Sequence, residues 1–265
     1  MSTYKSTVDE IRERFDGEVE TYTNLETGQV ATTDAPLAMS LVAEAAAATT
    51  PHARELLDVG CGGGNYTLKL LQHIPNLNVT LVDLSQRMLD RAAQRIQPQT
   101  KGTVETIHSD IRALQLGQQR FDIIVASAVL HHLRTGDEWR SVFQKFHDAI
   151  KPGGSIWIFD LIESPIPEVQ TLLWRHYGEY LTSVNGEAYR DELFSRIIEE
   201  DTPRPVFFQL ELLRSVGFSD VDILHKNSCY AAFGAVKRSS THPSGVATNL
   251  GEQTVPRPSG SGRSA

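Results

Sequence analysis

Short apolar runs rich in Val, Ile and Leu alternate with longer polar stretches between residues 54 and 159. This alternation is typical of βαβ units, which build a parallel sheet covered by helices. The apolar runs predict five strands, at residues 55–59, 79–82, 104–107, 121–126 and 155–159. Helices are predicted to begin near Asn65, Ser85 and Asp137, and Pro152-Gly153-Gly154 ends the last helix before the fifth strand.

Further elements are predicted on both sides of this region. An amphipathic stretch at 8–15, a polar link at 21–33 and an Ala-rich helix at 36–48 precede it and could cap a ligand site. A helical insertion at about 168–200, a helix that ends near Phe218, and two strands at 221–224 and 230–236 follow it. From Arg238 onward the chain has too few apolar residues to fold, so a disordered tail is expected.

These elements predict one α/β domain with a lid. The expected division is a helical cap at 1–50, a main domain at 51–237 with a helical insertion at 165–205, and a tail at 238–265. The chain of 265 residues, 40% hydrophobic, is long enough to bury one good core.

The charge and the cysteine content of the chain indicate which binding partners and which cellular compartment to expect. The net charge of -8 provides no global positive field that would attract a nucleic-acid backbone. Cys61 and Cys229 are far apart and lack metal-ligand spacing, which indicates a reducing compartment and no zinc. The N-terminus has neither an apolar signal core nor a run that could span a bilayer. We therefore expect a cytoplasmic protein with no metal and no membrane contact.

A glycine-rich turn is the strongest local signal. Gly60, Gly62 and Gly64 directly follow an apolar strand and open a helix, where glycine permits a tight turn and close approach to a nucleoside. Asp83 ends the second strand 23 positions after Gly60, near the spacing of about 20 residues for a carboxylate that binds ribose hydroxyls. No Gly-Lys-Ser/Thr follows, which excludes a Walker loop. The pattern predicts an adenosine-containing ligand.

Three further blocks lie near the ends of later strands: His-Ser-Asp-Ile at 108–111, the run from Phe121 to Leu133, and Ile-Lys-Pro-Gly-Gly at 150–154. Together with the glycine turn they resemble the class I S-adenosylmethionine-dependent methyltransferases over about residues 54–160. The resemblance implies a Rossmann-like, seven-stranded, mostly parallel sheet whose last strand is antiparallel, a place that residues 230–236 suit. It also implies S-adenosylmethionine as the cofactor and methyl transfer as the activity.

The resemblance also assigns cofactor contacts. The segment from Asp58 to Gly64, with Gly60 and Gly62, would hold the methionine part, and Asp83 with its neighbour Leu84 would bind the ribose. Asp110 and Ile111 would contact the adenine, and Ser127 would lie near the methionine end. The three acids could instead cap the helix or turn that follows each of them.

Methyl transfer needs an aligned acceptor and a site without water, and a general base helps where the acceptor is a phenol, an amine or an acidic carbon. His131 and His132 lie on the loop after the fourth strand, facing the expected site, although they could merely shape that loop. Tyr22, His176 and Tyr177 in the lid are further candidates. Apart from Asp160 and Glu163 no carboxylate cluster supports metal-dependent O-methylation.

Other functions stay open at this point. The loop at 126–129 lacks the motif with paired prolines that amino-nucleobase methylases use. The segments at 14–19, 176–180 and 217–237 look like the bacterial tRNA wobble-uridine carboxymethyltransferase, whose carboxylated cofactor would need an arginine such as Arg190 or Arg196. A cofactor-binding module without catalysis and a nicotinamide dehydrogenase are the remaining alternatives. The acidic balance and the histidine pair favour a small-molecule acceptor over nucleic acid, and a homodimer is left open.

Overall fold

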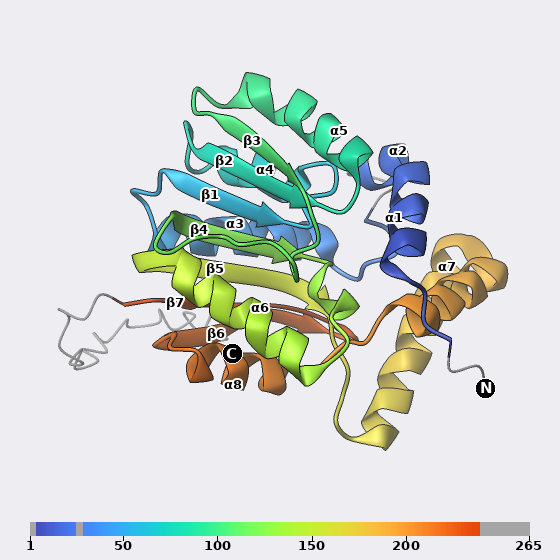
Figure 1. Ribbon diagram of the computed structural model, residues 1–265. Coiled ribbons are helices and arrows are strands. Elements are labelled where there is room, and N and C mark those ends of the chain that lie inside the picture. The colour runs from blue at the N-terminus through green and yellow to red at the C-terminus, as the bar shows by residue number, and fades with distance from the viewer. Residues whose placement is uncertain (1–3, 25–28, 239–265) are drawn as a thin grey trace, which may run out of the picture.

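The computed structural model describes residues 4–24 and 29–238. Seven strands form one sheet in the order β3-β2-β1-β4-β5-β7-β6 (Figure 1). The strands are β1 (Glu55–Val59), β2 (Asn78–Asp83), β3 (Val104–His108), β4 (Phe121–Ser127), β5 (Ile150–Leu161), β6 (Asp220–Asn227) and β7 (Tyr230–Val236). Strands β1 to β5 pair in parallel, whereas β7 is antiparallel to both β5 and β6. The predicted Rossmann-like sheet with an antiparallel last strand is confirmed.

Eight α-helices accompany the sheet in the described residues: α1 (Val8–Gly17), α2 (Val19–Thr23), α3 (Ala35–Thr49), α4 (Asn65–Leu71), α5 (Gln86–Ile96), α6 (Gly136–Ala149), α7 (Pro167–Glu200) and α8 (Val206–Ser215). Short 3₁₀ turns lie at η1 (Gln97–Gln99) and η2 (Leu130–His132). Among these residues no helix combines the length and apolar character needed to cross a membrane.

Two hydrophobic cores lie on opposite faces of the sheet because successive strand residues point to opposite sides. In β1, Leu56 belongs to the core under α3, α4 and α5, while Leu57 belongs to the core under α6 and α8. In β4, Ile123 and Ile124 divide in the same way. Burial on both faces explains why consecutive positions in these strands, Leu56 with Leu57 and Ile123 with Ile124, are apolar.

The central helices begin where the sequence predicts. Helix α4 starts at Asn65, and Ser85 is the N-cap of α5, where its hydroxyl accepts a hydrogen bond from the Met88 amide. Helix α6 starts at Gly136 after a capping box between Thr135 and Glu138. Each of these helices therefore begins directly after the loop that leaves the carboxyl end of a strand.

Three boundaries differ from the sequence expectations. Strand β5 begins at Ile150 because Phe121 pairs with Ile150 and Ile123 with Ser155, so the Pro-Gly-Gly segment forms a bulge inside the strand. The expected polar link at 21–33 includes the end of α2. Helix α7 is interrupted by non-helical backbone at Asn185 and Gly186. The tail expected at the C-terminus lies outside the described residues beyond Arg238.

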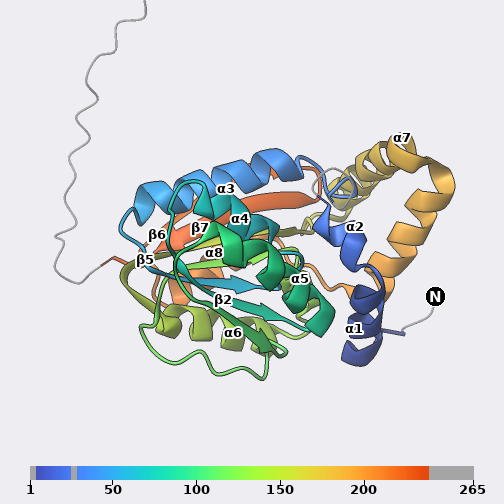
Figure 2. The ribbon, with the colours of Figure 1, turned by 90° about the horizontal axis from the view of Figure 1, so that it is seen from above.

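Helices α1, α2 and α7 lie beyond the edge at which the parallel strands end, whereas α3 lies along the sheet (Figures 1 and 2). The guanidinium of Arg14 on α1 binds both carboxylate oxygens of Glu200, the last residue of α7, with the Nε bond at 2.7 Å. The Ser6 amide donates to the Glu199 carbonyl at 2.9 Å. The N-terminal segment and the end of α7 thus form one layer over the carboxyl edge of the sheet, where open α/β sheets bind ligands.

Candidate active site

The glycine turn leaves β1 in a conformation that only glycine adopts without strain. The amides of Gly60 and Cys61 both donate to the Val82 carbonyl, at 2.8 and 3.1 Å, which ties the turn to the end of β2. Gly60 has a φ of 65°, and a Cβ there would lie 2.6 Å from Val129. Gly64 has a φ of 81° and packs against Ile96 of α5. The turn therefore brings bare backbone to the carboxyl edge of the sheet.

Asp83 at the end of β2 connects the glycine turn to the next helix. Its carboxylate oxygens accept hydrogen bonds from the amides of Gly62 and Ser85, both at 2.9 Å. Burial raises the pKa of Asp83, and these amide hydrogen bonds act against that rise. Each carboxylate oxygen has a second lone pair, so it can still accept from a ligand hydroxyl. The helix cap itself is Ser85, which frees Asp83 for the cavity.

Asp58 is buried at the base of the same turn. Its carboxylate accepts a hydrogen bond from the Thr67 hydroxyl in the first turn of α4, at 2.6 Å. Burial raises the pKa of Asp58 to about 6, against the lowering effect of Thr67. The carboxylate thus contacts the start of α4, as the capping alternative expects, and also lines the cavity described next.

A cavity lies against the turn, with about 970 Å³ of empty space that includes its open mouth. Its walls come from the strand ends and from the N-terminal segment: Phe15, Tyr22, Gln29, Thr32, Ala35, Asp58, Gly60, Cys61, Gly62, Gly63, Asn65, Tyr66, Asp83, Leu84, Met88, Ser127, Ala128, Val129, His132 and Phe159. Most of the predicted cofactor contacts are therefore brought together. Gly64 lies outside this lining because its Cα faces α5.

A smaller neighbouring cavity of about 390 Å³ contains the other predicted contacts, Asp110 and Ile111, and shares Gly60, Asp83 and His132 with the first. The Arg112 guanidinium binds both carboxylate oxygens of Asp110, and the Arg112 amide donates to the same group at 2.8 Å. Burial acts to raise the pKa of Asp110, but the hydrogen bonds from Arg112 outweigh burial and lower it. Asp110 is therefore an ionised carboxylate that also caps the short turn after β3.

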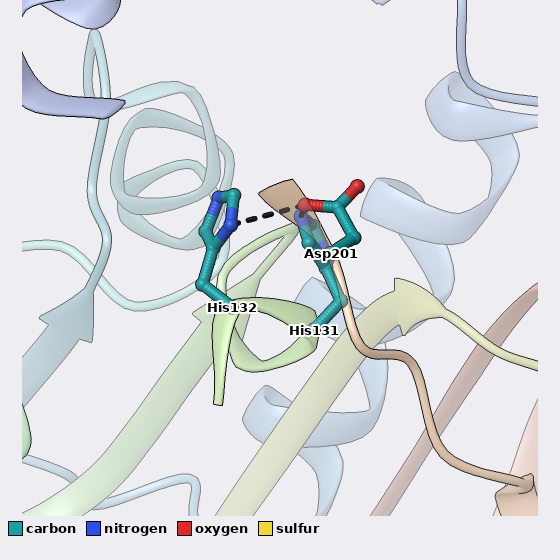
Figure 3. A group of neighbouring side chains, drawn as sticks. All are labelled: His131, His132 and Asp201. Carbon is teal, nitrogen blue, oxygen red and sulfur yellow. Dashed lines mark ion pairs between the residues drawn. The ribbon is translucent and has the colours of Figure 1, made fainter. Parts of the chain in front are cut away.

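The two histidines after β4 have different surroundings. The His132 side chain lines both cavities, whereas His131 lines neither. The Nδ1 atom of His131 is hydrogen-bonded to the buried carboxylate of Asp160, which also accepts from the His131 amide at 3.0 Å. The Asp201 carboxylate lies 3.1 Å from Nδ1 of His132 and 3.7 Å from Nε2 of His131 (Figure 3). The sequence placed both rings toward the site, but the structure places only His132 there.

The carboxylates around His131 decide its charge. Burial lowers the pKa of His131, but Asp201 and Asp160 outweigh burial and raise it to about 9. His131 is therefore an imidazolium at neutral pH. One atom from each of His131, His132 and Asp201 lies within 4.8 Å of the others, a spacing that a cation could also bridge.

The remaining candidates from the sequence lie apart from the cavity or on its edge. Tyr22 lines it, while the Tyr177 hydroxyl donates to the Ala31 carbonyl at 2.7 Å and His176 is an exposed partner of Glu179. Arg190 pairs with Asp191, and Arg196 pairs with Glu18 and Glu192. Neither arginine lines the cavity, so neither is placed to bind a carboxylated cofactor there.

Several lining residues carry no signal that the sequence reveals. Gln29 and Phe159 belong to no motif, and Phe15 is part of the segment at 14–19 that suggested only the tRNA-modifying alternative. Asp201, which contacts His132, is far from the histidines along the chain. Of these site residues, only Asp160 could be singled out from the sequence, because it directly follows the apolar run of the fifth strand. The sequence suggests it solely as a metal ligand. Phe15 lies on α1 and Asp201 directly follows α7, whereas Phe159 and Asp160 lie on β5 and Gln29 precedes α3.

The lining fits a nucleoside with a cationic tail. Asp58 and Asp83 are acidic, and no Lys or Arg side chain lines the cavity among the described residues. Residues 56–154 match the methyltransferase domain family. This segment is a class I S-adenosylmethionine-dependent methyltransferase domain. S-adenosylmethionine, whose sulfonium and ammonium groups are positive, suits the acidic lining of this methyltransferase domain.

Curated relatives agree with this assignment. An uncharacterised methyltransferase of Mycobacterium bovis is 30% identical over 119 residues, which is 45% of this chain and 55% of that protein. A demethylmenaquinone methyltransferase of Lactococcus lactis is 23% identical over 171 residues, or 63% of this chain and 66% of that protein. The chain thus spans about half the length of the Mycobacterium relative that it matches.

Solved structures share the fold of the methyltransferase domain and its surroundings. An O-methyltransferase family protein from Burkholderia thailandensis superposes with a TM-score of 0.61 at 19% identity, covering 89% of this chain and 62% of that one. The 1,6-didemethyltoxoflavin-N1-methyltransferase of the same organism, solved with S-adenosylhomocysteine, has a TM-score of 0.59 at 19% identity and covers 90% and 94%. At such identities the likeness shows the fold.

Proposed function

We propose that this protein transfers a methyl group from S-adenosylmethionine to a small, uncharged acceptor. The observation that carries the proposal is the single cavity in which the glycine turn, the Asp83 carboxylate and the His132 ring meet. Cofactor-binding groups alone would suit a binding module. A histidine in the same lining adds a group that can take a proton from an acceptor.

The chain's own residues would hold the cofactor in three parts. Asp83 accepts from ribose hydroxyls, the region of Asp110 and Ile111 takes the adenine, and Asp58 with the glycine turn receives the methionine end, close to Ser127. When bound, S-adenosylmethionine supplies an electrophilic methyl group on a positive sulfur. Phe15 and Tyr22 close the cavity from the N-terminal side and exclude water from it.

An uncharged acceptor follows from the rest of the lining. Aromatic rings of Phe15, Tyr22 and Phe159 offer apolar contact to a flat molecule, and the described lining has no Lys or Arg to balance an acidic acceptor. Relatives named for demethylmenaquinone and 1,6-didemethyltoxoflavin act on small molecules, which supports this class. The overall charge of -8 and the two buried free cysteines favour a cytoplasmic enzyme that does not bind nucleic acid.

Calorimetry and a transfer assay together test the proposal. We expect the purified protein to bind S-adenosylhomocysteine and not NAD, and to transfer labelled methyl from S-adenosylmethionine to a component of a neutral metabolite fraction. His132→Gln should lower the transfer rate by about 10²–10⁴ with unchanged S-adenosylhomocysteine affinity. Binding without transfer to any fraction would point to a non-catalytic module, and binding of NAD alone would point to a dehydrogenase.

A carboxylated cofactor is the second candidate to test. Its extra carboxylate would need a positively charged side chain. Arg190 and Arg196, the arginines that the sequence suggests for this role, pair with acids outside the cavity. We therefore expect the mass of any copurified ligand to be that of the ordinary cofactor or its demethylated product. A mass higher by one carboxyl group would favour the tRNA-modifying alternative.

A further inference from the structure

Asp201 and His132 form a buried contact at the rear of the proposed active site. Asp201 follows the last residue of α7, and its carboxylate lies 3.1 Å from Nδ1 of His132 (Figure 3). Both atoms are buried, and neither makes a hydrogen bond of good geometry with any group among the described residues, the 3.1 Å contact between them included. The separation of 3.1 Å is nevertheless within hydrogen-bond distance, so a small reorientation of the Asp201 carboxylate would complete the bond.

This contact leaves the other nitrogen of His132 available. The Nε2 atom lies on the edge of the ring away from Asp201 (Figure 3), and the ring itself lines the cavity. The ring of Phe15 meets His132 edge to face, with centroids 6.0 Å apart, and limits how the imidazole can turn. In a neutral imidazole only one nitrogen carries hydrogen, so a carboxylate at Nδ1 favours the tautomer with a free lone pair on Nε2.

We propose that Asp201 is a positioning residue that binds Nδ1–H of His132 and so makes Nε2 of His132 the base that receives the acceptor's proton. The inference rests on the proposed function and names the proton-accepting atom within it. His131 contributes differently, because as an imidazolium fixed between Asp160 and Asp201 it holds the Asp201 carboxylate in place.

The proton and the electrons balance in this arrangement. The acceptor's lone pair forms the new bond to the methyl carbon, and the carbon–sulfur bond breaks with its electron pair returning to sulfur. The proton that the acceptor loses goes to Nε2 of His132, and the Asp201 carboxylate stabilises the resulting imidazolium without itself being protonated. His132 returns the proton to solvent when the products leave.

The charges around the pair support an ionised Asp201. The charged and titratable groups around Asp201 are His131 and His132 after β4, Arg14 on α1, Lys5 before α1 and Tyr230 on β7. Asp160 on β5 and Glu200 on α7 act on the neighbouring His131. Burial acts to raise the pKa of Asp201, but the two histidines and Arg14 outweigh burial and lower it. A base must be neutral before it takes a proton. Because the Asp201 carboxylate stays ionised, it can orient the neutral His132 ring.

Histidine-labelled protein allows a test that requires no known acceptor. Long-range ¹⁵N–¹H correlation spectra of the full chain report which ring nitrogen carries hydrogen, and His132→Gln assigns the signal. We expect His132 to be in the Nδ1–H form in the wild-type protein, and Asp201→Asn to shift it mainly to the Nε2–H form. Asp191→Asn, an exposed acid on α7, is the matched control and should leave the tautomer unchanged.

Three results would overturn the inference. One is an Nε2–H tautomer of His132 in the wild-type protein. This measurement does not depend on whether any variant folds. Another is an unchanged tautomer in folded Asp201→Asn. The third is about one equivalent of zinc or another metal in the purified protein, with His131 and His132 signals that move on chelation. S-adenosylhomocysteine binding in the same samples reports separately on the proposed function.

Once an acceptor is known, turnover gives a second reading. We expect Asp201→Asn to lower kcat by about 10²-fold or more with little change in the KM for S-adenosylmethionine. Wild-type kcat in the variant would overturn the positioning role, whereas a folded wild-type protein that transfers no methyl would instead overturn the proposed function.

Discussion

The carboxylate of Asp83 accepts a hydrogen bond from the backbone amide of Gly62 at 2.9 Å. The end of β2 and the glycine turn after β1 are thereby joined into one surface. We therefore expect a ligand that binds at the glycine turn to contact Asp83 as well, so that this single acid on a neighbouring strand affects affinity for the cofactor.

Replacing Asp83 with alanine is expected to weaken binding of S-adenosylhomocysteine by about 1–3 kcal/mol, because a charge-assisted hydrogen bond to the ribose is lost. Titration calorimetry measures the change. Asp90→Ala removes an exposed carboxylate on α5 and should leave the affinity intact. Equal affinity of Asp83→Ala and the wild-type protein would contradict the ribose assignment.

The contact between Gly60 and Val129 gives a steric prediction. A Cβ at position 60 would lie 2.6 Å from Val129, and the φ of 65° adds about 1–2 kcal/mol of strain for any other residue. Gly60→Ala should therefore lower both the melting temperature and S-adenosylhomocysteine affinity, as thermal scans and calorimetry would show. Adding Val129→Ala should restore only part of the loss, since the backbone strain persists. Full recovery would mean that the clash is the whole effect.

The raised pKa of His131 predicts how stability depends on pH. The folded protein binds this proton with a pKa of about 9, against about 6.5 for an unfolded histidine. The stabilisation is thus complete below pH ~6.5 and is lost as pH rises through about 9. We expect the free energy of urea unfolding to fall by an amount on the order of 3 kcal/mol between pH ~6.5 and ~9.5.

Variants separate His131 from other titrating groups in that experiment. His131→Gln should flatten the decline between pH ~6.5 and ~9.5, since the proton is then bound in neither state. His176→Gln replaces an exposed histidine on α7 and should keep the wild-type dependence. A decline of equal size in His131→Gln would assign it to a different group.

The pair between Arg14 and Glu200 is expected to fasten α1 to the end of α7. Arg14→Met keeps the apolar stem of the side chain but leaves a buried Glu200 carboxylate without its partner, at a cost of about 2–4 kcal/mol in unfolding free energy. Hydrogen exchange of α1 should also become faster. Arg91→Met on α5 removes a 3.5 Å pair with the exposed Glu20 and a surface hydrogen bond to Gln94, and should change stability by less than about 0.5 kcal/mol. Unaltered exchange in α1 would argue against the fastening.

Periodicity and glycine chemistry were enough to predict much of the site from the chain alone. The apolar runs at β1 and β4 indicated strands buried on both faces, and Gly60 could be assigned to a turn because it follows a strand and opens a helix. Asp83 could be placed beside that turn because parallel strands end at one edge. These are local or topological constraints, which a linear sequence expresses directly.

The strand pattern and the family resemblance of the sequence therefore determined the Rossmann-like sheet and the methyltransferase class, and they predicted the carboxyl edge as the candidate site. Only the tertiary structure distinguished the two histidines, because Asp160 binds the His131 ring and Asp201 meets the His132 ring from segments far away in the chain. It also decided that Phe15 lines the cavity and that Arg190 and Arg196 stay outside it. The direction in which a side chain points depends on partners that the folding of α1 and α7 brings together, and no local spacing records such partners.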